Sequence, residues 1–141
     1  MSGTMHQFQE VCRKKVRLAM RNMNKPQSTF DYEMWVGCDR EHFRQHMHKK
    51  LDRWNELSEQ RIQMRMCDCD HICPFRIVQF LSADLQENAC RMLCHYTNLQ
   101  PLPGFFNRLK SDHWSTEDHS IWFQTIFKNP EFDDIYWPVH I

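Results

Sequence analysis

Between residues 67 and 95 the chain gathers seven side chains of the kinds that bind transition metals. Four lie in the run from Cys67 to Cys73, and three lie together from Cys90 to His95. Structural zinc takes four Cys or His ligands in a tetrahedron, usually as two close pairs on separate pieces of chain. The sequence therefore predicts a structural zinc ion, with ligands drawn from Cys67, Cys69, His71, Cys73, Cys90, Cys94 and His95.

One ligand set suits these spacings best, with His71 and His95 as substitutes: Cys67 or Cys69 with Cys73, completed by Cys90 and Cys94. The alternative is that these are buried free thiols, because i, i+4 spacing on a helix is also core spacing. That alternative suits Cys90 and Cys94, but the first run is interrupted by Asp68 and Asp70 and makes no apolar face. The two aspartates either accept hydrogen bonds from ligands or keep the segment solvated.

A second alternative treats Cys69 and Cys73, and Cys90 and Cys94, as twin C-x3-C pairs. This pattern resembles the small helical-hairpin chaperones of the mitochondrial intermembrane space, which are disulfide-bonded. Pro74 directly after the first pair and the additional Cys67 depart from that family.

Histidines elsewhere offer weaker candidates. His42 and His46 have the i, i+4 spacing that converges on a metal, with His48 nearby, but no glutamate stands between them as in a HExxH zinc protease. We expect them to be solvated surface residues. His113 and His119, near Asp112 and Asp118, have the types needed for acid–base chemistry, but loops and helix caps attract the same residues.

No sequence motif predicts catalysis. With only three glycines the chain has no phosphate-binding loop, dinucleotide fingerprint or nucleophile elbow. Cys94 and His95 are adjacent, so on a helix their side chains point about 100° apart and do not form a thiol–base pair. We expect a non-enzymatic protein; a zinc hydrolase or thiol enzyme would need an open metal position or a low-pKa cysteine.

Basic residues near the N-terminus form a cationic helix face that suits phosphates or a nuclear import signal: Arg13, Lys14, Lys15, Arg17 and Arg21. The alternative is a solvated face, or one paired with the acidic C-terminal half. Residues 1–25 carry six Lys/Arg against Glu10, residues 26–66 balance, and residues 67–141 carry five Lys/Arg against ten Asp/Glu. Aromatic side chains for base stacking are missing beside the basic residues, since Phe8 belongs to the apolar stripe.

Length and composition indicate a single domain, 1–141, located in the cytoplasm or the nucleus. Seven cysteines is an odd number, which a disulfide framework would leave unbalanced, so reduced thiols are expected. No apolar run approaches the ~20 residues that span a bilayer, and no membrane association or secretory leader is expected.

The elements that must position these residues are mainly α-helical: a small helical bundle with a zinc-stapled Cys/His loop and an extended C-terminal tail. Helical periodicity predicts a basic amphipathic helix over 5–24, ended by Pro26, and a long helix over 39–66 capped by Asp39. Residues 27–38 are expected to be irregular or extended, and 67–73 to be a loop within a 67–95 Cys/His module.

Farther along, the pattern predicts a short buried helix from Ile77 to Leu81 and a further helix, capped by Ser82, that stops at Pro101-Leu-Pro-Gly104. The aromatic region 105–141 contains a variant capping box at Ser115 and Asp118, which opens a helix running to Pro130. The tail from Phe132 onward is expected to be extended.

Two resemblances concern viral proteins. Ile121-Trp-Phe-Gln, Asn129-Pro-Glu-Phe-Asp-Asp-Ile-Tyr136 and His140 resemble the C-terminal part of the small non-structural nuclear protein of bocaparvoviruses, which implies viral RNA processing and replication. The chain lacks that family's Arg/Ser-rich front and its C-x2-C. Trp54 followed by Cys67-x-Cys69 is similar to the Trp-His-Cys-x-Cys-His accessory proteins of anelloviruses, but the expected histidines are replaced by Ile62 or Gln63 and by Phe75.

These observations lead to two functional hypotheses. The first is a zinc-stabilised accessory or adaptor protein, of viral type, that contacts protein partners through exposed aromatics such as Trp114, Trp122, Tyr136 and Trp137. The second is a nucleic-acid-associated regulator that uses the basic N-terminal helix.

Overall fold

The computed structural model describes residues 3–111, 113–129, 132 and 134–138. It is mainly α-helical, with one two-stranded antiparallel sheet. The described elements, in chain order, are α1 (Gly3–Asn22), α2 (Tyr32–Val36), α3 (Arg40–Ser58), η1 (Met64–Met66), β1 (Cys67–His71), η2 (Phe75–Phe80), α4 (Ala83–Leu93), η3 (Tyr96–Asn98), β2 (Leu99–Pro103), α5 (Gly104–Lys110), α6 (Thr116–Trp122) and η4 (Phe123–Phe127).

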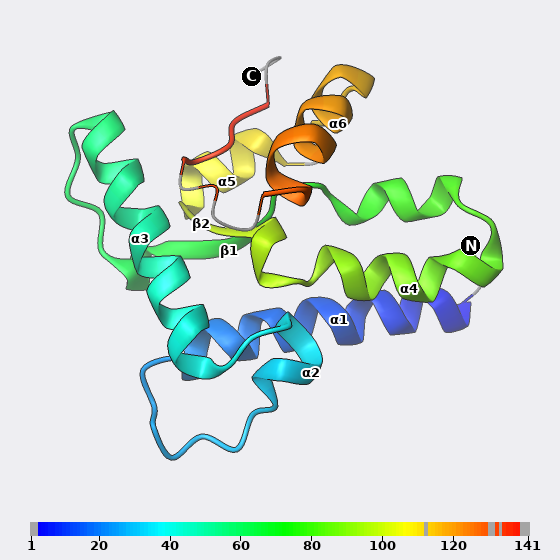
Figure 1. The fold of residues 1–141 in the computed structure, drawn as a ribbon, viewed down its shortest axis with the longest axis horizontal. Coiled ribbons are helices and arrows are strands. Elements are labelled where there is room, and N and C mark those ends of the chain that lie inside the picture. The colour runs from blue at the N-terminus through cyan, green and yellow to red at the C-terminus, as the bar shows by residue number, and fades with distance from the viewer. Residues whose placement is uncertain (1–2, 112, 130–131, 133, 139–141) are drawn as a thin grey trace.

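The sheet lies between two helical layers. In Figure 1, α1 and α4 run alongside one another on one side of the strands, α5 and α6 lie on the other, and α3 crosses one end. The hydrophobic core includes residues of α1, α3, α4, α6 and β2, and it begins with the stripe of α1, where Cys12, Val16, Ala19 and the following Met23 are at most 1% exposed. Burial of this stripe fixes α1 on its neighbours and leaves its basic face outward.

Helix α1 is the helix expected over 5–24, shifted by two residues. The prediction that 27–38 is irregular or extended was wrong for 32–36, where α2 forms, while 27–31 and 37–38 form neither helix nor strand. Asp31 accepts a hydrogen bond from the Met34 amide at 3.1 Å, and Gly37 ends the helix in the left-handed conformation with φ of 78°. Tyr32 then donates its hydroxyl to the Ala19 carbonyl at 2.7 Å and ties α2 to α1.

The long helix expected over 39–66 begins as predicted, with the Asp39 carboxylate accepting from the His42 amide at 2.7 Å. It ends at Ser58, not at residue 66, because Glu59 adopts the left-handed conformation (φ 57°). The Asn55 side chain accepts from the Ile62 amide at 2.8 Å and donates to the Ile62 carbonyl at 3.0 Å. These two bonds satisfy the backbone after the helix and turn the chain toward β1.

The prediction that 67–73 is a loop was also wrong, because residues 67–71 form β1. This strand pairs with β2 in a register that sets Cys67 opposite Pro103 and His71 opposite Leu99. Proline lacks an N–H, which a two-stranded ribbon tolerates because every second amide points away from the partner strand. The alternation of Cys or His with Asp matches the period of a strand, and it places the metal-binding types on one face and the two aspartates on the other.

The second half follows the predictions in part. The short helix expected from Ile77 to Leu81 is the 3-10 helix η2, which ends at Phe80. Helix α4 begins after Ser82 but ends at Leu93, so that Pro101 lies in β2 and does not stop a helix. The capping box is confirmed: the Asp118 amide donates to the Ser115 hydroxyl, and the Ser115 amide donates to the Asp118 carboxylate, both at 3.0 Å. The helix it opens, α6, gives way to the π-helical turn η4 at Phe123.

The C-terminal segment is anchored where it is described. The buried Lys50 ammonium donates to the carbonyls of Phe132 and Asp134, each at 2.7 Å. The residues of the sequence interpretation that lie outside the described residues are Asp112, Pro130, Glu131, Asp133 and His140.

Candidate functional site

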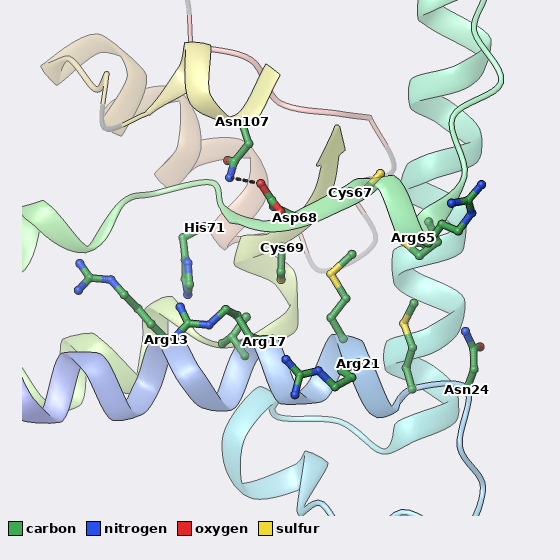
Figure 2. A pocket seen from close by; sticks show the side chains of 14 residues that line it. Arg13, Arg17, Arg21, Asn24, Arg65, Cys67, Asp68, Cys69, His71 and Asn107 are labelled. Carbon is green, nitrogen blue, oxygen red and sulfur yellow. Dashed lines mark hydrogen bonds between the residues drawn. The ribbon is translucent and has the colours of Figure 1, made fainter. Parts of the chain in front are cut away.

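A groove of about 750 Å³ opens between α1 and β1. Figure 2 shows Arg13, Arg17 and Arg21 in a row along α1, with Cys69 and His71 directed from β1 toward that helix. Arg65, from η1, stands at the end of the groove nearer Arg21. The apolar lining comes from the aliphatic Val16 and from methionines: Val16, Met20, Met23 and Met64. The groove therefore combines a cationic wall with an apolar base.

The cationic wall follows from helical spacing. Arg13, Arg17 and Arg21 are four residues apart, so they repeat about every 6 Å along one face of α1. Arg13 is partly occupied, because it donates to Glu10 at 2.7 Å and lies 4.8 Å from the centre of the Phe75 ring. Arg17 and Arg21 are exposed and form no ion pair with any residue that the structure describes. Their charge is available to a ligand.

The other two predicted basic residues lie outside the groove. Lys14 is exposed, and the Lys15 ammonium lies 5.2 Å from the centre of the Trp35 ring. The alternative of internal pairing between the basic helix and the acidic C-terminal half finds no ion pair in the described residues. One acidic side chain, Asp68, does line the groove, where it accepts from the Asn107 amide at 3.3 Å.

His71 forms part of the groove wall and packs against Phe75, with ring centres 4.6 Å apart. Burial, and then the nearby charges of Arg13, Lys110 and Arg17, lower the pKa of His71 to about 3. The imidazole is therefore neutral at pH 7, and its unprotonated nitrogen can accept a hydrogen bond or bind a metal.

Behind the groove, cysteines from α1, β1 and the end of α4 lie near one another, and one of them, Cys94, lies beside His71. The Cys94 sulfur lies 3.9 Å from His71 Nε2 and 3.9 Å from the Cys12 carbonyl oxygen. The interaction between the two thiols lowers the pKa of Cys12 and raises the pKa of Cys94. Cys69 and Cys90 are near enough to Cys94 to raise its pKa further. We call Cys12, Cys69, His71, Cys90 and Cys94 the thiol cluster.

Three predicted ligands lie outside this cluster. Cys73 is buried with its backbone held by Asn98, and its thiol lies near the charges of Lys110 and Arg76. The Cys67 thiol donates to the Gln63 carbonyl at 3.7 Å.

His95 packs on Tyr96 and makes a 2.9 Å hydrogen bond with the Thr97 hydroxyl. Within residues 3–111, 113–129, 132 and 134–138, no three His, Cys, Asp or Glu side chains converge closely enough to hold a metal ion.

Cys12 was not among the predicted ligands. Its position in the apolar stripe of α1, between Phe8 and Val16, is that of an ordinary core residue, and only the packing of α1 on α4 brings it to Cys94. Sequence reasoning had no signal for that contact, since 82 residues separate the two.

The opposite face of β1 carries a buried polar network. Lys110 donates to the Asp70 carboxylate at 3.1 Å and to the carbonyls of His71 and Ile72, each at 3.2 Å. Gln100 donates to the same carboxylate at 3.0 Å. Burial raises the pKa of Asp70, although Lys110 and Gln100 oppose that shift. Asp70 is therefore neither solvated nor a partner of a ligand, and it fixes β1 from behind.

Other candidates from the sequence have structural roles. His46 is largely buried and bonds to the Leu99 carbonyl at 2.8 Å, so the prediction that it is a solvated residue was wrong. His113 bonds to the Lys110 carbonyl at 3.0 Å. Of the aromatics expected to be exposed, Trp122 and Tyr136 are buried, at 6% and 7% exposure.

Comparisons with protein-family models, with curated proteins and with solved structures found no match for this chain. The resemblances to viral proteins therefore stay predictions. None of the helices described is long and apolar enough to cross a membrane.

Proposed function

We propose that this chain is a non-enzymatic accessory or adaptor protein whose working surface is the groove between α1 and β1. The observation that carries the proposal is the alignment of Arg13, Arg17 and Arg21 along this groove, with Arg65 at its end. Clustered like charges repel one another, and a binding function explains why four of them share one groove.

The thiols in and behind the groove support a binding role over a catalytic one. Burial raises the pKa of Cys67 and of Cys90 to about 11, and it also raises the pKa of Cys69. A nucleophilic cysteine needs a lowered pKa and access to substrate. Cys12, whose pKa is lowered by the Cys94 hydrogen bond, is 0% exposed.

The proposed adaptor role is tested by crosslinking the protein to its partners in cells and then purifying the crosslinked species. Arg17→Glu/Arg21→Glu should abolish the crosslinked species, whereas Lys14→Glu/Lys25→Glu, which makes the same change in net charge outside the groove, should retain it. Equal recovery with both variants would place the working surface elsewhere.

Zinc is the staple that this proposal assigns to the thiol cluster, with Cys12, Cys69, His71 and Cys94 as ligands. The 3.9 Å between Cys94 Sγ and His71 Nε2 is close to the ~3.6 Å edge of a zinc tetrahedron with Zn–S of about 2.3 Å and Zn–N of about 2.0 Å. Convergence requires side-chain rotation of Cys12 and Cys69, since no three groups among the described residues meet at one point as they stand. Three thiolates and Zn²⁺ carry a net charge of −1, which Arg13 and Arg17 would offset.

Metal analysis distinguishes this ligand set from the one expected from the sequence. The zinc proposal expects one equivalent of zinc in protein purified without chelator, reduced in Cys12→Ser and Cys69→Ser but retained in Cys73→Ser. Retention in all three variants, or loss in Cys73→Ser alone, would remove Cys12 from the set. Protein that contains no zinc and melts unchanged in a strong chelator would refute the staple itself.

A nucleic-acid-associated regulator is the second candidate, because three of the five predicted basic residues line the groove. Binding to phosphates would weaken steeply as the salt concentration rises. The logarithm of the association constant falls linearly with the logarithm of the salt concentration, and the slope is proportional to the number of phosphates contacted. Binding of oligo-uridine tighter than that of an acidic peptide, with a salt slope reduced in Arg17→Glu/Arg21→Glu, would favour this candidate over a protein partner.

A further inference from the structure

The chemistry of the groove allows its occupant to be specified, on the assumption that the proposed adaptor role is correct. We propose that the groove binds an acidic, partly apolar segment of a partner protein. Its carboxylates would meet Arg17 and Arg21 while its apolar side chains rest on the methionines.

The spacing of the two exposed arginines matches the spacing of carboxylates on a peptide. Arg17 and Arg21 are four residues apart on α1, which sets their positions about 6 Å apart along the helix. Carboxylates two residues apart on an extended peptide are separated by about 6.6 Å along the chain, and those four apart on a helix by about 6 Å. Guanidinium groups bind carboxylates through two parallel hydrogen bonds, so each exposed arginine can hold one acidic side chain.

The base of the groove is apolar and suits apolar side chains of a partner. Met20 and Met64 are partly exposed in it, and Val16 and Met23 are buried beneath. Methionine is flexible and polarisable, and it suits binding surfaces that adapt to apolar side chains. A peptide that carries both acidic and apolar residues can place its carboxylates on Arg17 and Arg21 and its apolar side chains on the neighbouring Met20 and Met64.

The lining of the groove favours a peptide over a nucleic acid. Single-stranded nucleic acids are held by phosphate contacts together with aromatic side chains on which the bases stack. The described lining of the groove contains four arginines but neither Phe, Tyr nor Trp. Asp68 also lines the groove and would repel a phosphate chain along the β1 side, whereas a peptide can present an uncharged residue there.

The size of the groove sets the length of the segment. A volume of about 750 Å³ lies within the 300–1,000 Å³ typical of ligand pockets. The arginines Arg13 and Arg21 are eight residues apart, so the wall extends about 12 Å along α1. This length accommodates about four residues of an extended chain.

The experiment uses fluorescence anisotropy with three labelled probes. These are a 12-residue peptide of alternating Glu and Leu, the same pattern with Lys in place of Glu, and a 12-nucleotide oligo-uridine. The proposal expects the Glu-Leu peptide to bind, at least tenfold more tightly than either other probe at physiological salt. Arg17→Glu/Arg21→Glu should weaken that binding at least tenfold, and Lys14→Glu/Lys25→Glu should change it less than twofold.

A Met20→Gln variant, which removes apolar surface without adding charge, tests the apolar contribution separately. It should weaken the Glu-Leu peptide at least fivefold and leave the binding of an all-Glu peptide of the same length within twofold. Circular dichroism melting checks that each variant is folded, and among the residues that the structure describes none of these side chains has a hydrogen-bond or ion-pair partner that would be lost.

The outcomes separate this inference from the adaptor role. Tighter binding of oligo-uridine than of the Glu-Leu peptide overturns the inference in favour of nucleic acid. Failure of the peptide to bind, while groove variants still lose the crosslinked partner in cells, overturns the acidic segment and keeps the adaptor. If Arg17→Glu/Arg21→Glu still binds the peptide and still crosslinks to its partner, both the acidic segment and the adaptor role are overturned.

Discussion

Acid should destabilise this protein through His46, and the size of the effect follows from its surroundings. His46 is largely buried, and its Nε2 donates to the Leu99 carbonyl on β2, the strand that pairs with β1. Burial lowers the pKa of His46 to about 4, the hydrogen bond to Leu99 opposes the shift, and the charge of Lys50 adds to it. The unfolded chain has an ordinary histidine pKa of about 6.5.

The sign follows from proton binding. Between pH 6.5 and pH 4 the unfolded chain binds a proton at this site and the folded chain does not, so the stability associated with neutral His46 is complete above pH 6.5 and is lost as the pH falls. At pH 5 the pH lies about 1.5 units below the pKa of the unfolded chain, which corresponds to a loss of roughly 2 kcal/mol of stability at 1.36 kcal/mol per unit. Partial solvent access makes this an upper value.

Urea unfolding of the wild type and of His46→Gln, at pH 7.5 and pH 5, isolates this contribution. Glutamine keeps an N–H donor for the Leu99 carbonyl but does not titrate, while the carboxylates common to both proteins cancel in the comparison. Between pH 7.5 and pH 5, the free energy of unfolding of the wild type should fall by about 1 to 2 kcal/mol more than that of His46→Gln. Parallel losses in the two proteins would refute the assignment of His46 as a buried neutral residue.

Three further substitutions test the packing around the site. Lys110→Met leaves the buried Asp70 carboxylate without its cation and should cost about 3 to 5 kcal/mol in urea unfolding, with much of that loss recovered in the double variant with Asp70→Asn. Gly37→Ala would place a methyl group 2.4 Å from the His95 ring at a φ of 78°; it should lower the melting temperature by several degrees, and an unchanged value would exclude the close approach. Lys50→Met removes two hydrogen bonds to carbonyls of the C-terminal segment, and faster proteolysis of that segment with an unchanged core is the expected result.

Local signals in the sequence were sufficient for the parts of the fold that depend on local physics. The α1 stripe, the Asp39 cap and the capping box at Ser115 were predicted because helical periodicity and side-chain-to-backbone bonds involve residues a few positions apart. The end of the long helix was missed, because it depends on Glu59 adopting a left-handed conformation and on the turn closed by Asn55.

The candidate site was only partly predictable for the same reason. Cys-Asp-Cys-Asp-His was interpreted as a loop on composition, although its period of two is that of a strand. The two prolines of its partner strand were interpreted as the stop of a helix. The gathering of Cys12 with Cys94, and of Arg65 with the arginines of α1, depends on tertiary packing between segments far apart in the sequence. The basic face of α1 was found, but not which of its residues share the groove.

The most direct test of the central claim is a nuclear magnetic resonance titration that observes the arginine Nε–H and methionine methyl signals as the Glu-Leu peptide is added. The groove account predicts saturable shifts at Arg17, Arg21 and Met20, with the exposed Met34 on α2 unchanged. Shifts confined to residues outside the groove, or no saturable shift at Arg17 and Arg21, would contradict it.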